Sequence, residues 1–265
     1  MKKETLSVAV AQLVISDVDR EANMHEIKEI VHDISHRSKT MPDLLMLPEL
    51  AVEGYAFTKN RWNKYSEDDT VENFYSELAR GSDMHIMAGF AERRGGKWYD
   101  SAGCFSPNGG VQIYRKIHLW GEEKKFFIPG DSVSCMDIMG WKVAAQICAD
   151  VGFPELSRRQ ALEGAELIAV VGAWTKPYGY MWRNCCLARA TENQIALAAS
   201  NRLGDFADGG EFCGVSMASD ARGKETANLL EEPGWFTARF RRDDMKEWRR
   251  LVPWFEMRRP EIYGK

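Results

Sequence analysis

The chain has 265 residues, of which 45% are hydrophobic, and a formal net charge of −4. This length fits one large α/β domain, so we expect a single domain over residues 1–265. The acidic balance argues against a general polyanion-binding surface, and no apolar segment reaches the roughly 20 residues that span a bilayer. We therefore expect no nucleic-acid or membrane partner. The amino terminus lacks a signal-peptide pattern, so we expect a cytoplasmic protein with reduced cysteines.

The first half of the chain predicts alternating strands and helices. Residues 6–13 alternate like a strand, residues 21–37 carry apolar residues at helical spacing, and residues 44–47 form a short apolar run that leads to Glu49. A helix over 71–80 and a strand over 86–90 follow. Short apolar runs closed by turn residues are typical of buried parallel strands. Glu49 thus lies at a strand's carboxyl end, where open α/β sheets place reactive groups.

The middle of the chain predicts three antiparallel additions, over 102–105, 111–118 and 133–138. Lys116 lies near the end of the second of these strands. His118 follows two residues later, so in an alternating strand it should share the face of Lys116. We expect it to support the site structurally.

The second half repeats the alternation. A strand over 143–147 ends at Cys148, and Asp150, Gly152 and Pro154 then break the pattern. A helix over 154–163, a strand over 167–171, a helix over 182–193 and a strand over 195–200 complete the prediction. This β-α-β order implies helices packed outside sheets.

Cys148 is a candidate nucleophile because of its place at a strand end. Only the thiolate attacks well, so a nearby base must take the proton or a nearby cation must favour the ionised form. Taken alone, Cys148 could equally be a small core thiol. A papain-like pair with His85 or His118 also stays open on the residues alone.

Other chemistry-bearing patterns predict no metal site. His32 and His36 have zincin-like spacing, but the apolar stripe of their helix turns both away from the core and no third ligand accompanies them. The six cysteines show no CxxC spacing. Arginines gather between 239 and 259, but interspersed acids indicate a solvated or subunit-facing surface.

Three motifs in order resemble those of the nitrilase, or carbon–nitrogen hydrolase, superfamily. PELAVEGY resembles its Glu motif, YRKIHLW its Lys motif and ICADVGFPE its Cys motif, and the likeness extends over nearly the whole chain. The resemblance implies a four-layer αββα sandwich in which Glu49, Lys116 and Cys148 converge. It also implies a second glutamate beyond the lysine. Measured back from the Pro129-Gly130 landmark, Glu123 fits that place better than Glu122.

The resemblance implies hydrolysis of a non-peptide C–N bond through a Cys148 thioester, without metal or cofactor. Glu49 would be the general base, and Lys116 would stabilise the oxyanion together with the Ala149 N–H. Glu123 would hold Lys116 or Glu49 in place. The resemblance also implies a homodimer or a higher homo-oligomer.

The substrate is predicted only by class, as a small amide or carbamoyl compound. True nitrilases usually follow the cysteine with Trp-Glu, whereas this chain has Ala149-Asp150, which argues against nitriles. Tyr55, Trp174 and Tyr178 are expected, with Ala149, to line the substrate pocket. The alternatives are an N-carbamoyl amine or amino-acid hydrolase with the same triad, and a catalytically silent binding subunit.

Overall fold

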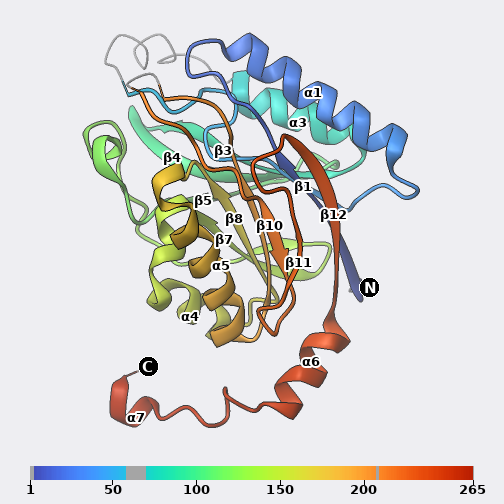
Figure 1. Ribbon diagram of the computed structural model, residues 1–265, viewed down its shortest axis with the longest axis vertical. Coiled ribbons are helices and arrows are strands. Elements are labelled where there is room, and N and C mark those ends of the chain that lie inside the picture. The colour runs from blue at the N-terminus through green and yellow to red at the C-terminus, as the bar shows by residue number, and fades with distance from the viewer. Residues whose placement is uncertain (1–2, 58–69, 207–208, 265) are drawn as a thin grey trace.

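A computed structural model describes residues 3–57, 70–206 and 209–264 (Figure 1). Two six-stranded sheets form its centre, in the orders β12-β1-β2-β3-β4-β5 and β11-β10-β9-β8-β7-β6. The strands of the first sheet are β1 (Thr5–Gln12), β2 (Leu44–Met46), β3 (His85–Arg94), β4 (Lys97–Phe105), β5 (Val111–Arg115) and β12 (Gly234–Arg241). Those of the second are β6 (Met136–Ile138), β7 (Trp141–Ile147), β8 (Leu167–Gly172), β9 (Ala196–Asn201), β10 (Met217–Ser219) and β11 (Glu225–Asn228).

The sheets pack face to face and helices cover their outer faces. Strand side chains alternate in direction, so Val8 and Val10 of β1 face the middle layer with Val143 of β7. Ala9 points the other way and packs with Ile27 of α1 (Arg20–Arg37). The helices α1 and α3 (Thr70–Ser82) cover the first sheet, and α4 (Pro154–Leu162) and α5 (Gly179–Asn193) cover the second. The architecture is the expected αββα sandwich.

The predicted helices and strands are present, but their first and last residues differ from those predicted. The main error is the strand over 111–118, because β5 ends at Arg115. Lys116 N–H bonds the Asp100 carbonyl, but His118 N–H bonds the Asp150 carboxylate, so the ladder stops between them. The expectation that His118 shares the face of Lys116 is therefore wrong.

The carboxyl-terminal part contains one strand, β12, that reaches into the segment where the sequence predicted only a charged surface. β12 pairs antiparallel with β1 along its whole length, so Arg239 and Arg241 lie on an edge strand. Arg242 then opens α6 (Arg242–Leu251) and binds Glu166 through Nε at 2.6 Å. Beyond α6 the chain runs below α4 and α5 in the view of Figure 1 to α7 (Pro260–Tyr263), and Phe255 of this segment packs against the helices of the second sheet. In the described ranges, no helix is both long and apolar enough to cross a membrane.

Candidate active site

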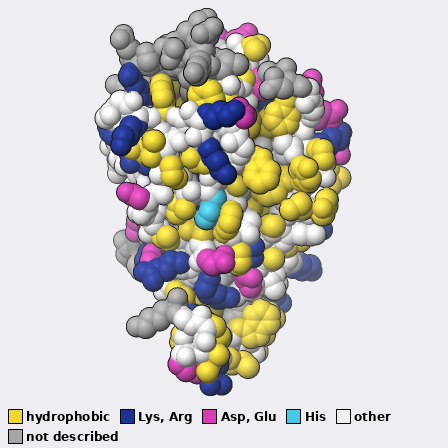
Figure 2. Space-filling model, turned by 90° about the vertical axis from the view of Figure 1, so that its left-hand side faces the viewer, with side chains coloured by type: hydrophobic (Ala, Val, Ile, Leu, Met, Phe, Trp, Pro, Cys, Tyr) yellow, Lys and Arg dark blue, Asp and Glu magenta, His cyan; other side chains and the backbone are white. Residues whose placement is uncertain are grey.

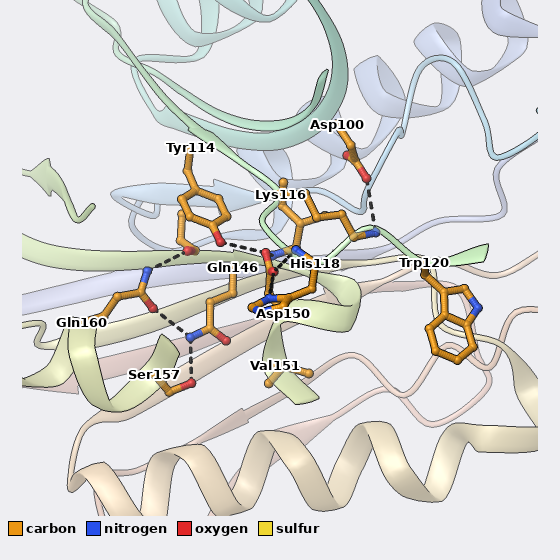
Figure 3. Close-up of polar contacts among 12 residues, drawn as sticks. Asp100, Tyr114, Lys116, His118, Trp120, Gln146, Asp150, Val151, Ser157 and Gln160 are labelled. Atoms are coloured by element: carbon orange, nitrogen blue, oxygen red, sulfur yellow. Dashed lines mark hydrogen bonds and ion pairs between the residues drawn. The ribbon is translucent and has the colours of Figure 1, made fainter. Parts of the chain in front are cut away.

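Lys116 is the centre of a buried ion cluster at the ends of several strands. Its Nζ lies 2.6 Å from Glu49 Oε1 and 2.7 Å from Glu123 Oε1. Asp100 Oδ2 of β4 lies 3.3 Å from the same nitrogen (Figure 3). All four side chains have no exposed surface. An ammonium group and three carboxylates are thus shielded together from water.

Electrostatics in this cluster favour the charged lysine. Burial alone would lower the pKa of the Lys116 ammonium, but the three carboxylates together raise it well above the ordinary value. The three acids have oxygens within 4.8 Å of one another, a spacing that could hold a metal ion. The Lys116 ammonium already contacts one oxygen of each acid, so the cluster contains its own cation.

Glu49 is fixed where β2 leaves the first sheet. Its N–H reaches the Gly172 carbonyl of β8 in the other sheet at 3.4 Å, and Gly89 of β3 packs directly against its backbone. A Cβ added at Gly89 would lie 2.4 Å from the Glu49 Cα, so only glycine fits there. The next residue, Leu50, has a φ of 47°. The tight turn at this strand end therefore aims the Glu49 side chain into the space between the sheets.

Glu123, rather than Glu122, reaches Lys116. It lies in the short helix η1 (Gly121–Lys125), and its Oε2 accepts the Trp120 N–H at 2.8 Å. Its Oε1 accepts hydrogen bonds from Lys116 Nζ and from the Tyr55 hydroxyl. Glu122 is exposed and pairs with Lys125 at 2.7 Å. Within this short helix Glu123 is therefore buried, whereas its neighbour Glu122 is exposed to solvent.

Cys148 follows β7 and opens the short helix η2 (Cys148–Gly152). It is 7% exposed and has a φ of 45°, a left-handed conformation that a non-glycine residue adopts at a cost. Burial raises the pKa of the Cys148 thiol well above its usual range, and the charge of Glu49 raises it further, against the opposite effect of Lys116. The resting group is thus a thiol, and it lies within the electrostatic reach of Glu49 and Lys116.

The Cys148 turn is held by polar contacts behind it. Asp150 accepts hydrogen bonds from the Ile147 N–H at 3.1 Å, the Tyr114 hydroxyl at 2.8 Å and the His118 N–H at 3.0 Å (Figure 3). His118 Nδ1 also lies 2.7 Å from Asp150, and its ring stacks on Phe153. Asp150 thereby connects the segment after Lys116 to the segment after Cys148. The charged groups that act most strongly on the pKa of the Cys148 thiol are Glu49, Lys116 and Glu123.

The remaining candidate histidine partner, His85, and the histidines with zincin-like spacing lie elsewhere. His85 begins β3 and pairs in register with Leu44, at the opposite strand ends from Glu49. His32 and His36 are exposed on α1, with ring centroids 4.0 Å apart. Among the described residues, the one cluster with metal-ligand spacing consists of carboxylates only.

The four expected pocket residues occupy different positions. Tyr55 contacts the ion cluster, since its hydroxyl donates to Glu123, and its ring packs edge-on against Phe57 and Phe212. Ala149 directly follows Cys148 and is partly buried. Trp174 packs against the core cluster that contains Cys148, and its indole N–H bonds the Tyr178 carbonyl at 2.9 Å. Tyr178 itself is 51% exposed.

Asp100 is the site residue that sequence reasoning missed. The sequence shows it as one acid among 39 in a segment with no motif. Its burial depends on Lys116, which arrives from the end of a different strand. The only local signal is a charged residue two positions before the predicted strand at 102–105, which is too common to be specific.

Comparisons with known proteins identify the family and the fold. The family model described as carbon–nitrogen hydrolase matches residues 7–250. An (R)-stereoselective amidase from a Pseudomonas species is 32% identical over 225 residues, which cover 84% of this chain and 82% of the relative. An amidase structure from Nesterenkonia superposes with a TM-score of 0.82 at 26% identity, covering 94% of this chain and 96% of the other. A carbon–nitrogen hydrolase from Helicobacter pylori has a TM-score of 0.90 at 24% identity, covering 98% and 97%, which shows the shared fold.

Proposed function

We propose a specific chemistry for this chain, which belongs to the carbon–nitrogen hydrolase family and is an amidase-type hydrolase. It hydrolyses a small linear amide through a thioester on Cys148, with Glu49 as general base and Lys116 as oxyanion stabiliser. The observation that carries this proposal is the buried Lys116 cluster, whose charges act directly on the Cys148 thiol.

The first half-reaction forms the thioester. Glu49 removes the proton from the Cys148 thiol as the sulfur attacks the amide carbon, which matches a thiol that is protonated at rest. The carbonyl oxygen becomes an oxyanion, and Lys116 and the Ala149 N–H stabilise it. Glu49 then gives its proton to the leaving nitrogen, the C–N bond breaks, and ammonia or an amine departs.

The second half-reaction releases the acid. Glu49, again a carboxylate, takes a proton from water as the water oxygen attacks the thioester carbon. The C–S bond breaks, and the Cys148 sulfur takes the proton back from Glu49. Glu123 holds Lys116 in place throughout, because it is fixed by Tyr55 and by the Trp120 N–H. Tyr55, Ala149, Trp174 and Tyr178 are proposed to surround the substrate.

Ammonia release from a panel of short amides, ureido acids and nitriles tests this function. Wild-type enzyme should release ammonia from an amide and form an acyl adduct on Cys148 that intact-mass spectrometry detects. Cys148→Ala should abolish both, while the control Cys135→Ala, which changes a half-buried thiol beside α4, should leave them unchanged. Undiminished turnover in Cys148→Ala would refute the mechanism.

The same panel separates the remaining functions. A carbamoyl adduct formed only with ureido compounds would assign an N-carbamoyl amine or amino-acid hydrolase with the same triad. Absence of turnover and of Cys148 alkylation by iodoacetamide would instead assign a binding subunit.

We also propose that the protein forms a homodimer through exposed apolar side chains. The segment after α6 exposes Trp254, Met257, Ile262 and Tyr263. Figure 2 shows further hydrophobic side chains gathered on one face, with acids and bases interspersed. Light scattering coupled to gel filtration should give a dimer mass for the wild type and a smaller mass for Trp254→Ser with Met257→Ser. A monomeric wild type would contradict this proposal.

A further inference from the structure

Asp100 is a third carboxylate at a lysine that two others already neutralise. Its side chain has no exposed surface, and its Oδ2 lies 3.3 Å from Lys116 Nζ. Its backbone carbonyl accepts the Lys116 N–H at 2.8 Å, so the two residues are also fixed to each other through the backbone. The proposed mechanism assigns roles to Glu49, Lys116 and Cys148 but none to Asp100.

Asp100 differs from Glu123 in the number of hydrogen-bond donors that reach its carboxyl oxygens. Glu123 accepts from Lys116, from Tyr55 and from the Trp120 N–H. Among the described residues, neither oxygen of Asp100 has a well-aligned donor, and Glu49 Oε2 lacks one too. A buried carboxylate without donors is costly. A proton on Asp100 removes this cost, because the resulting hydroxyl can donate to Glu49.

Counting charges leads to the same conclusion. With every acid ionised, one ammonium and three carboxylates would place a net charge of −2 in a region without solvent contact. Such a site takes up a proton rather than hold like charges together. Burial raises the pKa of Asp100 well above its usual range, and the charges of Glu49 and Glu123 and a hydrogen bond to Glu49 raise it further, against the effect of Lys116.

We propose that Asp100 is a positioning residue that stays protonated in the resting enzyme and donates a hydrogen bond to Glu49. This inference rests on the proposed function of the same site. The neutral acid orients the Glu49 carboxylate, which then receives the Cys148 proton with its remaining lone pairs. It also leaves the Lys116 charge balanced by two carboxylates rather than three, so the ammonium can still stabilise an oxyanion. The ionisable groups that act on Asp100 are Lys116, Glu49 and Glu123.

Infrared spectroscopy of the full-length enzyme tests the proton directly. At neutral pH the wild type should show the carbonyl stretch of a protonated, buried carboxyl group, and Asp100→Asn should lose it. The matched control is Glu92→Gln on the neighbouring strand β3. Glu92 is also buried, but it accepts two hydrogen bonds from Arg115 at 2.7 Å, and its pKa is lowered by these contacts despite burial. Glu92→Gln should therefore leave the band unchanged.

Kinetics test the positioning role. Asp100→Asn keeps a neutral donor of similar shape and should retain most of kcat at neutral pH. Asp100→Ala should lower kcat by about 10- to 100-fold, the loss expected when a hydrogen bond to a charged group is removed. In the wild type kcat/KM should decline at alkaline pH as Asp100 ionises, and Asp100→Asn should lose that part of the decline.

The outcomes distinguish this inference from the proposed function. If Asp100→Asn keeps the carboxyl band, the inference is wrong. It is also wrong if Asp100→Asn loses as much of its kcat as Asp100→Ala does. Either result would stand even if turnover still depends on Cys148. Turnover that persists in Cys148→Ala would refute the proposed function, whereas the infrared result does not depend on activity. Circular dichroism confirms that each variant is folded before it is compared.

Discussion

Replacing Lys116 by methionine should destabilise the protein and inactivate it for the same electrostatic reason. Methionine fills a similar volume but leaves the carboxylates of Glu49 and Glu123 without their cation, in a region with no exposed surface. Removing one partner of a buried ion pair typically costs about 3–5 kcal/mol, so we expect a loss of this size in the free energy of unfolding at neutral pH. Loss of the oxyanion donor should lower kcat by about 100- to 1,000-fold.

The pH dependence of this loss identifies its cause. Without Lys116, the pKa of the buried Glu123 carboxyl rises further above its unfolded value of about 4, so the folded state binds more protons. Its stability therefore falls as pH rises through this range. The difference in unfolding free energy between the wild type and Lys116→Met should be small near pH 4 and grow toward neutral pH.

Urea unfolding at several pH values, with ammonia release as the activity assay, measures both effects. The matched control is Lys125→Met, which breaks the exposed pair with Glu122 and should cost less than about 1 kcal/mol. Adding Glu123→Gln to Lys116→Met should recover part of the lost stability, because one buried charge is removed. If Lys116→Met costs no more than Lys125→Met, or its cost does not depend on pH, the buried-charge reasoning is wrong.

Three further predictions concern the same site. Glu123→Gln should lower kcat by at least about tenfold because it weakens the hold on Lys116, whereas Glu122→Gln on the exposed side of η1 should leave turnover unchanged. Gly89→Ala should destabilise the fold by more than about 1 kcal/mol and lower kcat, measured by urea unfolding and ammonia release, since its Cβ would meet the Glu49 backbone. At neutral pH the ultraviolet difference spectrum between the wild type and Cys148→Ala should contain no thiolate absorbance, because the pKa of the Cys148 thiol is raised. A thiolate band would contradict the proposed proton transfer from Cys148 to Glu49.

The sequence predicts those site residues that end strands. Glu49, Lys116 and Cys148 each follow an alternating or apolar run, and such runs specify strands through local periodicity. Glu123 could be distinguished from Glu122 only through the family resemblance, by its distance from the Pro129-Gly130 landmark.

The missed features depend on contacts between distant segments. β12 has an alternating pattern, but its arginines resembled a solvated surface, and its partner β1 lies more than 200 residues earlier. The alternation in YRKIHLW continues beyond Arg115, where β5 ends. The Lys116 N–H still bonds the Asp100 carbonyl of β4, but the His118 N–H bonds the Asp150 carboxylate instead. Periodicity cannot show where a strand loses its neighbour.

Convergence from separate strand ends also explains why the site is costly to build. Glu49 and Lys116 leave the first sheet and Cys148 leaves the second, and both Leu50 and Cys148 adopt left-handed backbone conformations at these exits. Residues in such conformations cost of order 1–3 kcal/mol each and persist only where the surroundings fix them. Here the packing of Gly89 against Glu49 and the contacts of Asp150 with the Cys148 turn provide that support. The αββα architecture thus supplies rigid strand ends that keep a base, a cation and a thiol together before any substrate arrives.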